Sequence, residues 1–192
     1  MLKSIAVFCG SSPGISETFG ESTEKLAETM AQAGISLVYG GANVGLMGIL
    51  ADKMLTSGSR VIGVIPKSLV DVEIAHTGLT DLQIVNSMHE RKARIAALAD
   101  GFIMLPGGPG SLDEFFEMLT WAQLGYHSKP CGILNVDHYY DDLLKFLDHA
   151  VTQGFFKLVH RNMIIVEASP QRLIERLKQY IPPLNKKWVN EV

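Results

Sequence analysis

Residues 105–114 hold the pattern that most clearly predicts chemistry. Three glycines and two prolines fill positions 106–110, between an apolar run and a helix-type pattern. Glycines allow a tight turn and the close approach of a ligand, and the free N–H groups at a helix start attract anions. An ordinary turn between a strand and a helix would need only one glycine. We therefore predict a phosphate-binding loop, with Ser111 as the helix cap and Glu114 as a nearby carboxylate.

Two more loops that follow apolar runs are rich in glycine. In residues 39–48, Gly45 and Gly48 are spaced for close packing of a helix on a sheet, whereas the pair Gly40 and Gly41 is expected to contact a ligand. In residues 9–12, Ser11 offers a hydroxyl to a phosphate or a ribose. This last signal is weak when taken alone.

A charged stretch, Met-His-Glu-Arg-Lys-Ala-Arg at residues 88–94, begins another predicted helix. Basic groups at a helix start oppose the local dipole, which favours acids, so their presence indicates a function. Arg91 and Lys92 are candidates for binding phosphate, and the arginine side chain can do so with two parallel hydrogen bonds. His89 is either a ligand contact or a structural residue.

The elements that must position these residues alternate along the chain. Strands are predicted at residues 5–9, 36–39, 60–65, 82–85, 101–105, 131–135 and 163–166. Helices are predicted at residues 21–33, 46–57, 87–99, 112–124, 139–153 and 170–180. Residues 67–79 are predicted to form a loop. Apolar strands separated by helices indicate a parallel sheet covered on both faces. We expect one Rossmann-like, doubly wound, three-layer α/β/α domain at residues 1–181, followed by a tail at 182–192. Ligands bind beyond the carboxyl ends of such strands, where the three glycine loops lie.

The composition excludes several classes of protein. The 192 residues include 17 basic and 20 acidic ones, a net charge of −3, and no basic stripe interleaved with aromatics, so we expect no nucleic-acid partner. Cys9 and Cys131 form neither a disulfide framework nor a metal cluster, which predicts buried thiols in a reducing cytoplasm and no metal site. Residues 29–51 are uncharged but contain five glycines, so we expect no membrane span. No signal peptide is expected either.

Three segments together resemble one known family. Residues 39–48, the Met-His-Glu-Arg-Lys of residues 88–92 and the Pro-Gly-Gly-Pro-Gly-Ser-Leu-Asp-Glu of residues 106–114 are similar to motifs of the LONELY GUY (LOG) family. Its members are cytokinin-activating phosphoribohydrolases, long mislabelled "lysine decarboxylases". The resemblance covers nearly the whole chain to about residue 180. Ser111 stands where the family usually has threonine, which keeps the hydroxyl, and Pro109 occupies the variable position of the signature.

The resemblance implies an N-glycosyl hydrolase that acts on N6-modified adenosine 5′-monophosphates and releases a free base and ribose 5-phosphate. It implies no cofactor, and a homodimer with the site near the subunit interface. The family's catalytic pair falls on Arg91 and Glu114. Its substrate contacts fall on Glu73, Lys92, Gly108, Pro109, Gly110, Ser111, Leu112, Asp113 and Thr120, to which the glycine loops add Gly41 and Ser11.

The expected chemistry agrees with these residue types. Cleavage of a glycosidic bond passes through an oxocarbenium-like state, which a carboxylate such as Glu114 stabilises while it positions water. Arg91 stays protonated, so it is expected to orient the phosphate or to stabilise developing charge rather than to act as an acid. An apolar pocket for a modified base would come from Met88, Phe115, Met118 and Trp121, which could equally be core residues. The sequence leaves open which base is preferred and whether plain AMP is a substrate.

Three other interpretations compete with this one. A pyridoxal-phosphate decarboxylase needs a Schiff-base lysine, and no lysine lies in a convincing cofactor loop. A non-catalytic carrier of a nucleotide or of molybdenum cofactor could use the same fold, but it would not need a carboxylate beside the sugar. A module that binds single-stranded DNA is disfavoured by the net charge.

Overall fold

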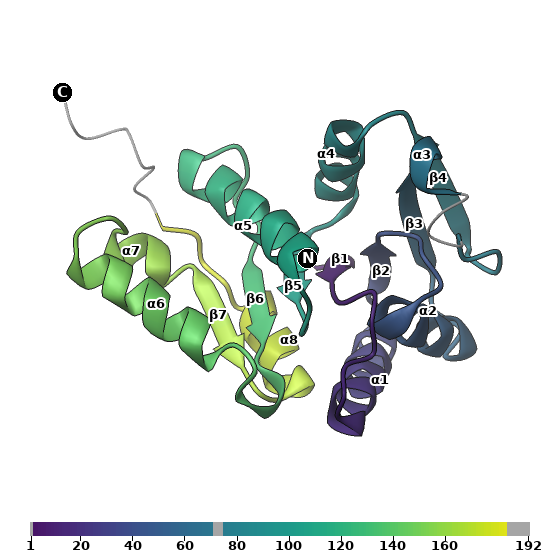
Figure 1. The fold of residues 1–192 in the computed structure, drawn as a ribbon, viewed down its shortest axis with the longest axis horizontal. Helices are drawn as coiled ribbons and strands as arrows, with labels where there is room; N and C mark the ends of the chain where they lie inside the picture. The colour runs from purple at the N-terminus through teal and green to yellow at the C-terminus, as the bar shows by residue number, and fades with distance from the viewer. Residues whose placement is uncertain (1, 71–74, 184–192) are drawn as a thin grey trace.

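Seven parallel strands form one sheet in the computed structural model, which describes residues 2–70 and 75–183 (Figure 1). The strands are β1 (Ser4–Phe8), β2 (Ser36–Tyr39), β3 (Val61–Pro66), β4 (Asp81–Val85), β5 (Gly101–Met104), β6 (Cys131–Leu134) and β7 (Ile164–Glu167). Their order in the sheet is β4-β3-β2-β1-β5-β6-β7, and every neighbouring pair is parallel. The chain therefore winds outward from β1 in one direction and then, from β5, in the other, which confirms the predicted doubly wound fold.

Helices cover both faces of this sheet. They are α1 (Glu17–Gln32), α2 (Gly45–Thr56), α3 (Lys67–Val70), α4 (Met88–Leu98), α5 (Pro109–Leu124), the 3-10 turn η1 (Val136–His138), α6 (Asp141–Thr152), α7 (Leu158–Arg161) and α8 (Pro170–Lys178). One apolar core joins α1, α2 and α8 to one face, and another joins α4, α5 and α6 to the other. Successive strand side chains alternate between the two cores, as Val7 and Phe8 do, because the pleat sends them to opposite faces. This arrangement is the predicted three-layer α/β/α domain.

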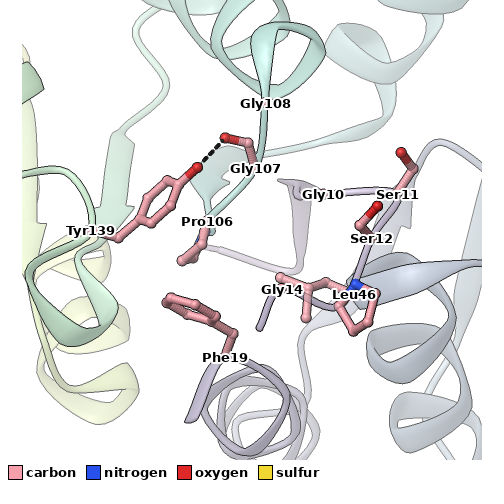
Figure 2. A pocket seen from close by; sticks show the side chains of 11 residues that line it. Gly10, Ser11, Ser12, Gly14, Phe19, Leu46, Pro106, Gly107, Gly108 and Tyr139 are labelled. Carbon is pink, nitrogen blue, oxygen red and sulfur yellow. Dashed lines mark hydrogen bonds between the residues drawn. The ribbon is translucent and has the colours of Figure 1, made fainter. Parts of the chain in front are cut away.

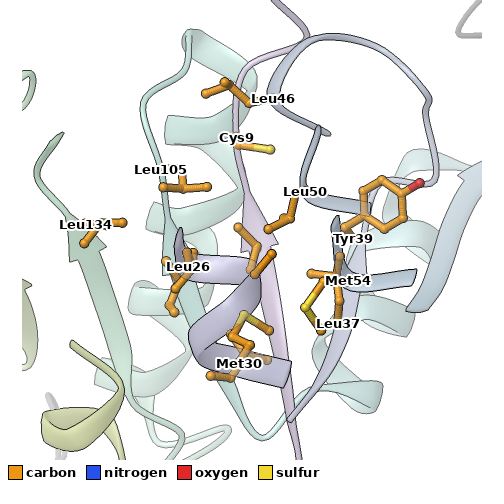
Figure 3. Close-up of a cluster of buried hydrophobic side chains, with 14 of the residues drawn as sticks. Cys9, Leu26, Met30, Leu37, Tyr39, Leu46, Leu50, Met54, Leu105 and Leu134 are labelled. Atoms are coloured by element: carbon orange, nitrogen blue, oxygen red, sulfur yellow. The ribbon is translucent and has the colours of Figure 1, made fainter. Parts of the chain in front are cut away.

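The core beneath α1 and α2 holds these two helices next to the site. Leu26 and Met30 of α1 meet Leu50 and Met54 of α2 over β1 and β2 (Figure 3). All four side chains are fully buried. Burial of such side chains stabilises a fold by about 1.5–3 kcal/mol each. The position of the loops at the ends of β1 and β2 therefore follows from packing on this face.

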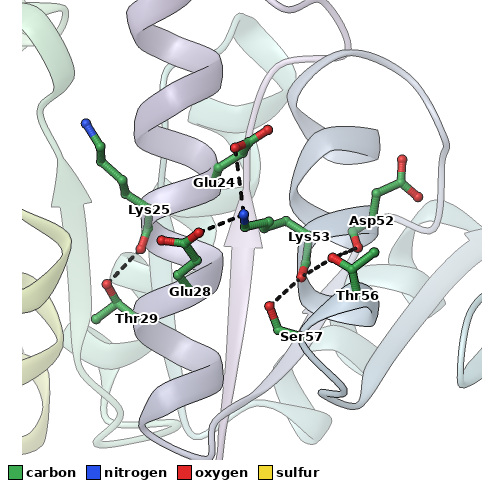
Figure 4. A network of polar contacts seen from close by, with 8 residues as sticks. All are labelled: Glu24, Lys25, Glu28, Thr29, Asp52, Lys53, Thr56 and Ser57. Atoms are coloured by element: carbon green, nitrogen blue, oxygen red, sulfur yellow. Dashed lines mark hydrogen bonds and ion pairs between the residues drawn. The ribbon is translucent and has the colours of Figure 1, made fainter.

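On the outer surface Lys53 joins the same two helices. Its ammonium lies 2.7 Å from Glu28 and 3.9 Å from Glu24 of α1 (Figure 4). Pairs exposed to this degree contribute little to stability, about 0–1 kcal/mol. The contact of α1 with α2 is thus maintained mainly by the apolar core.

Several helix starts differ from the prediction. Helix α5 begins at Pro109 rather than at residue 112, with Gly108 as its N-cap, so Ser111 lies inside the helix and does not cap it. Proline suits the first helical position because its fixed φ is already helical and its missing N–H is not needed there. Helix α1 begins at Glu17 rather than at residue 21, because Ser16 caps it by accepting a hydrogen bond from the amide of Thr18.

The start of α4 follows its sequence signal more closely. Ser87 caps the helix by accepting a hydrogen bond from the amide of Glu90 at 3.1 Å, as predicted. The Glu90 carboxylate then accepts from the amide of Asn86 at 2.8 Å, where a standard capping box would use Ser87 itself. The cap fixes the first turn of α4, and this turn contains Arg91.

Part of the expected 67–79 loop is helical. Lys67–Val70 form the one-turn helix α3 directly after β3. Residues 71–74 and 184–192 lie outside the described residues, so Glu73 and most of the expected tail remain predictions. Both cysteines are free and buried, as expected. Across residues 2–70 and 75–183, no helix is long and apolar enough to cross a membrane.

Backbone hydrogen bonds tie the glycine loops together at the carboxyl ends of β1 and β5. The amide of Gly10 donates to the carbonyl of Pro106 at 3.0 Å, and the amide of Leu46 donates to the carbonyl of Gly10 at 3.1 Å. Gly45 has φ +53°, and a Cβ there would overlap the backbone of Ser11. Helix α2 therefore starts in direct contact with the loop after β1, which only glycine permits.

We predict that Gly45→Ala lowers the free energy of unfolding by about 3 kcal/mol or more, because it adds a backbone clash to the strain of a positive φ. Gly34→Ala is the matched control. Gly34 has φ +66°, but a Cβ there would meet no atom within 4 Å, so only about 1 kcal/mol of backbone strain is expected. Urea unfolding of both variants measures the difference. If the two variants lost equal amounts of unfolding free energy, the contact between α2 and the loop after β1 would not be tight.

Candidate active site

Two adjoining cavities of about 330 Å³ each lie beyond the carboxyl ends of β1 and β5. This is the point where the strand order reverses, the usual ligand site of such sheets. We call the first the Arg–Glu cleft. Eight predicted site residues line it: Ser11, Arg91, Gly108, Pro109, Gly110, Ser111, Asp113 and Glu114. Five further residues, which the sequence does not predict as contacts, complete the lining: Cys9, Gly10, Met47, Leu69 and Met88. Of these, the sequence suggests only Met88, as part of an apolar pocket.

Arg91 is the most constrained side chain of the cleft. It is only 7% exposed, and its Nε donates to the carbonyl of Val64 within β3 at 3.1 Å. Its Nη2 donates to the carbonyl of Gly40 after β2 at 3.5 Å, and its Nη1 lies 3.5 Å from Glu114 Oε1. Two carbonyls thus fix the plane of the guanidinium, and a carboxylate from another helix balances its charge.

Gly40 makes room for this guanidinium. A Cβ at Gly40 would collide with Nη2 of Arg91. Gly41 is buried with φ +83°, packs near Ile65 and Leu82, and does not line the cleft. We expected this glycine pair to contact a ligand, and its positions instead serve Arg91 and the packing of the sheet. Only the neighbouring strands reveal these roles, so no local pattern signals them.

The glycines of the 106–111 loop have different neighbours. A Cβ at Gly107 would overlap Ser111 Oγ and lie 2.9 Å from the amide nitrogen of Gly10, so Gly107 is required by packing. A Cβ at Gly108 or Gly110 would meet no protein atom within 4 Å. The first amides of a helix have no partner within the helix, and because Pro109 has no N–H, those of Gly110 and Ser111 are the ones available. This surface suits the close approach of an anion.

Lys92 does not line the Arg–Glu cleft. Its ammonium lies 2.7 Å from Asp113 and 3.2 Å from Glu117, and its side chain is 15% exposed. Burial lowers the pKa of Lys92, but the hydrogen bonds to Asp113 and Glu117 outweigh it, so the pKa is raised overall. Lys92 therefore ties α4 to α5 as a fully protonated ammonium. The structure offers no support for its predicted contact with phosphate.

Other predicted residues lie apart from the cleft. Thr120 is exposed on α5, and its hydroxyl donates to the carbonyl of Phe116 at 2.7 Å. Leu112 packs against the core and does not line the cleft. Of the candidate apolar residues, Phe115 and Met118 belong to the core, and Trp121 packs partly buried against it. His89 is exposed.

Cys9 lies at the base of the cleft and is not a nucleophile. Burial raises the pKa of its thiol strongly, and the nearby Glu114 carboxylate raises it further. The thiolate is the reactive form of cysteine, so a thiol this hard to deprotonate is inert. Among residues 2–70 and 75–183, no group of three His, Cys, Asp or Glu side chains is placed to hold a metal ion.

Comparison with known proteins finds named relatives of this chain. Residues 47–177 match a family model described as "possible lysine decarboxylase". The chain is 50% identical over 165 residues to a cytokinin riboside 5′-monophosphate phosphoribohydrolase of Rhodococcoides fascians, which covers 85% of this chain and 83% of that protein. It is 44% identical over 180 residues to an enzyme of the same name from Arabidopsis thaliana. This match covers 94% of this chain and 84% of that protein.

Solved structures share the fold at lower identity. A molybdenum cofactor carrier protein from Chlamydomonas reinhardtii superposes with a TM-score of 0.69 at 18% identity, over 93% of this chain and 98% of that one. A molybdenum cofactor binding protein from Rippkaea orientalis superposes with a TM-score of 0.68 at 21% identity. The match covers 93% of this chain and 97% of that one. At such identities the likeness establishes the common fold alone.

The different environments of the loop glycines predict different effects on stability. Gly107→Ala is expected to lower the free energy of unfolding by about 2 kcal/mol, because the new methyl group displaces Ser111. Gly110→Ala, in the first turn of α5 with open space around it, is expected to be neutral or to stabilise by up to about 1 kcal/mol. Thermal or urea unfolding compares the two. If Gly110→Ala destabilised as much as Gly107→Ala, Gly110 would be a packing residue and not part of an open ligand surface.

Proposed function

This chain belongs to the LOG family of cytokinin riboside 5′-monophosphate phosphoribohydrolases, and from that premise we propose which residues carry out its reaction. The protein hydrolyses the N-glycosidic bond of N6-modified adenosine 5′-monophosphates and releases the free base and ribose 5-phosphate. One observation carries the assignment of residues. The buried Arg91 and the half-buried Glu114 face each other at 3.5 Å in a cleft whose rim is the open start of α5.

The start of α5 binds the 5′-phosphate. The amides of Gly110 and Ser111 donate to its oxygens, and the absence of side chains at Gly108 and Gly110 lets the phosphate approach the backbone. The positive end of the helix dipole adds to this attraction. Binding energy gained at the phosphate, remote from the reacting bond, orients the ribose toward Glu114. Selectivity for the 5′-monophosphate follows from this anchoring.

Glu114 performs the central chemical role. As the bond from C1′ to the base nitrogen breaks, positive charge develops on the sugar, and a carboxylate beside it stabilises that charge. Glu114 also directs a water molecule to C1′ and takes its proton. The electron pair of the broken bond leaves with the base, whose nitrogen acquires one proton from solvent, and Glu114 releases to solvent the proton that it took from water. The products are ribose 5-phosphate and the neutral base.

Arg91 serves as a fixed cation. Val64 and Gly40 hold its guanidinium through their carbonyls, so it keeps its position as charge moves during the reaction. Arginine stays protonated in proteins, so it is not a general acid. It holds the Glu114 carboxylate in place and stabilises negative charge that develops on the leaving base or on the phosphate.

The base occupies the apolar side of the same cleft. Met47, Leu69 and Met88 line it, and they come from α2, α3 and α4. Methionine adapts its shape to an aromatic ring or an alkyl tail. This lining suits adenine with an isopentenyl-type substituent and also admits plain adenine. AMP is therefore proposed as a second substrate.

The decarboxylase description does not fit the lysine nearest the site. Schiff-base formation requires an amine that loses its proton readily, and Lys92 has a raised pKa between Asp113 and Glu117. A carrier protein is the other candidate, because the solved neighbours include molybdenum cofactor carriers. A carrier has no need for a carboxylate such as Glu114 paired with the buried Arg91, which favours the hydrolase.

We also propose that the protein is a cytoplasmic homodimer. Tyr126 is 75% exposed and lines a surface hollow with Ala97 and Trp121, near the ends of α4 and α5, and Met88 at the start of α4 is 41% exposed. Apolar surface of this kind favours association. A partner that also covered the start of α4 would lie close to the Arg–Glu cleft, which Met88 lines. The two free cysteines suit a reducing compartment.

Glu114→Gln is expected to lower kcat by about a thousandfold while nucleotide binding persists, because it removes the charge that stabilises the transition state but keeps the shape. Glu117→Gln is the matched control. It makes the same change one turn along α5, next to Lys92 and outside the cleft, and its kcat should fall by less than about tenfold. Steady-state release of ribose 5-phosphate, with thermal unfolding of both variants, provides the measurement. Turnover by Glu114→Gln at the parent rate would refute the assignment.

Incubation of the protein with AMP and with isopentenyl-AMP tests the reaction itself. We expect ribose 5-phosphate and free base in equal amounts from at least one of the two. Binding of either nucleotide by calorimetry without release of any base would instead favour a carrier.

A further inference from the structure

A second cavity adjoins the Arg–Glu cleft on the other side of Gly108, and the reaction proposed above does not use it. We call it the aromatic pocket. Phe19 of α1 and Tyr139 after η1 form one side, and Leu46 and Ser12 lie opposite them (Figure 2). Its volume, about 330 Å³, is within the range of small-molecule sites.

Tyr139 is held in place although its side chain is substantially exposed. Its hydroxyl donates to the carbonyl of Gly107 at 2.9 Å, and its ring meets the ring of Phe19 edge-on at 5.7 Å. On its other side lies Tyr140 at 4.8 Å, whose hydroxyl donates to the carbonyl of Leu105 at 2.8 Å. Tyr139 as a whole residue nevertheless remains 47% exposed, so an aromatic side chain is presented in a fixed orientation.

The backbone before Tyr139 is strained. Asp137 and His138 have φ of 47° and 60°, in the left-handed region that non-glycine residues occupy at a cost of about 1–2 kcal/mol each. Hydrogen bonds from Asn135 to Asp141 at 2.8 Å, and between His138 and Asp141 at 3.1 Å, maintain this shape. Strain that is kept by surrounding contacts is characteristic of functional segments. Here its consequence is the position of Tyr139 over the pocket.

The aromatic pocket is continuous with the phosphate subsite. Both cavities share Gly10, Ser11 and Gly108. In the proposed complex the phosphate lies at the start of α5 and the nucleoside extends from it toward Glu114. The aromatic pocket then lies on the side of the phosphate that faces away from the nucleoside. A group in this pocket would therefore be attached to the phosphate and not to the base.

We propose that the aromatic pocket binds a planar, uncharged ring joined through the 5′-phosphate, so that the protein binds adenosine 5′-phosphate esters with an aromatic group. This inference rests on the proposed position of the phosphate. The apolar contacts come from Pro13, Phe19, Leu46, Pro106 and Tyr139, and among the described residues that line the pocket none is charged. A neutral ring therefore fits this environment, whereas a second phosphate would lose its hydration without gaining a cation.

Two esters of AMP that differ only in the ring test the proposal. The phenyl ester and the methyl ester carry the same charge, and isothermal calorimetry gives the Kd of each for the full-length protein. We expect the phenyl ester to bind about tenfold more tightly than the methyl ester, as stacking and burial of one ring allow. Equal affinities would overturn the proposal.

Substitutions of Tyr139 locate the ring. Tyr139→Ala removes the aromatic face and should reduce the preference for the phenyl ester to about twofold or less. Tyr139→Phe keeps the face and loses only the bond to Gly107, so the preference should persist. Phe19→Ala, on the same side of the pocket, should weaken the preference as well. A preference that survives Tyr139→Ala and Phe19→Ala would place the ring elsewhere and overturn the proposal.

The plain nucleotide separates this inference from the proposed function. If AMP binds and is hydrolysed but the two esters bind equally, the aromatic pocket alone is misassigned. If Phe19→Ala weakens the binding of AMP as much as it weakens the binding of the phenyl ester, the pocket holds the nucleotide's own base. That result would overturn both the subsite and the proposed orientation of the substrate.

Discussion

The contact between Arg91 and Glu114 is the interaction on which the site depends. A buried guanidinium is tolerated only when its donors and its charge are satisfied, and here Val64 in β3 and Gly40 after β2 supply carbonyls while α5 supplies a carboxylate. Because these partners come from separate elements, the pair fixes α4, α5 and the sheet relative to one another. The same constraint explains Gly40, where any side chain would occupy the space of the guanidinium.

Around this pair, the glycines of the loops divide into two groups. Gly10, Gly45 and Gly107 allow backbones to approach one another, so that the loops after β1 and β5 and the start of α2 form one rigid edge. Gly108 and Gly110 instead face open space at the start of α5. The first group builds the site, and the second leaves room for a ligand that approaches the backbone. In the proposed site, this second group lets backbone amides contact the phosphate, because Lys92 is already paired with Asp113 and Glu117.

Much of the fold was predictable because it depends on local chemistry. Apolar runs located all seven strands to within a residue or two, and Ser87 marked the start of α4 through its cap. The starts of α1 and α5 were missed, because Ser16 and Pro109 lie among residues typical of loops. Helix α3 was missed because its single turn is too short to show a period, and it is this helix that brings Leu69 into the cleft.

The sequence by itself determined the doubly wound sheet and the loops that could meet a ligand, and its resemblance to the LOG family pointed to Arg91 and Glu114 as a pair. These depend on periodicity, on glycine and on motifs, all of which are properties of neighbouring residues. Only the tertiary structure decided that Lys92 pairs with Asp113 and Glu117, that Gly40 serves the guanidinium, and that Tyr139 forms the wall of a second pocket. These contacts join residues from 21 to more than 100 positions apart, and no local pattern specifies which distant side chains the packing of helices on the sheet brings together.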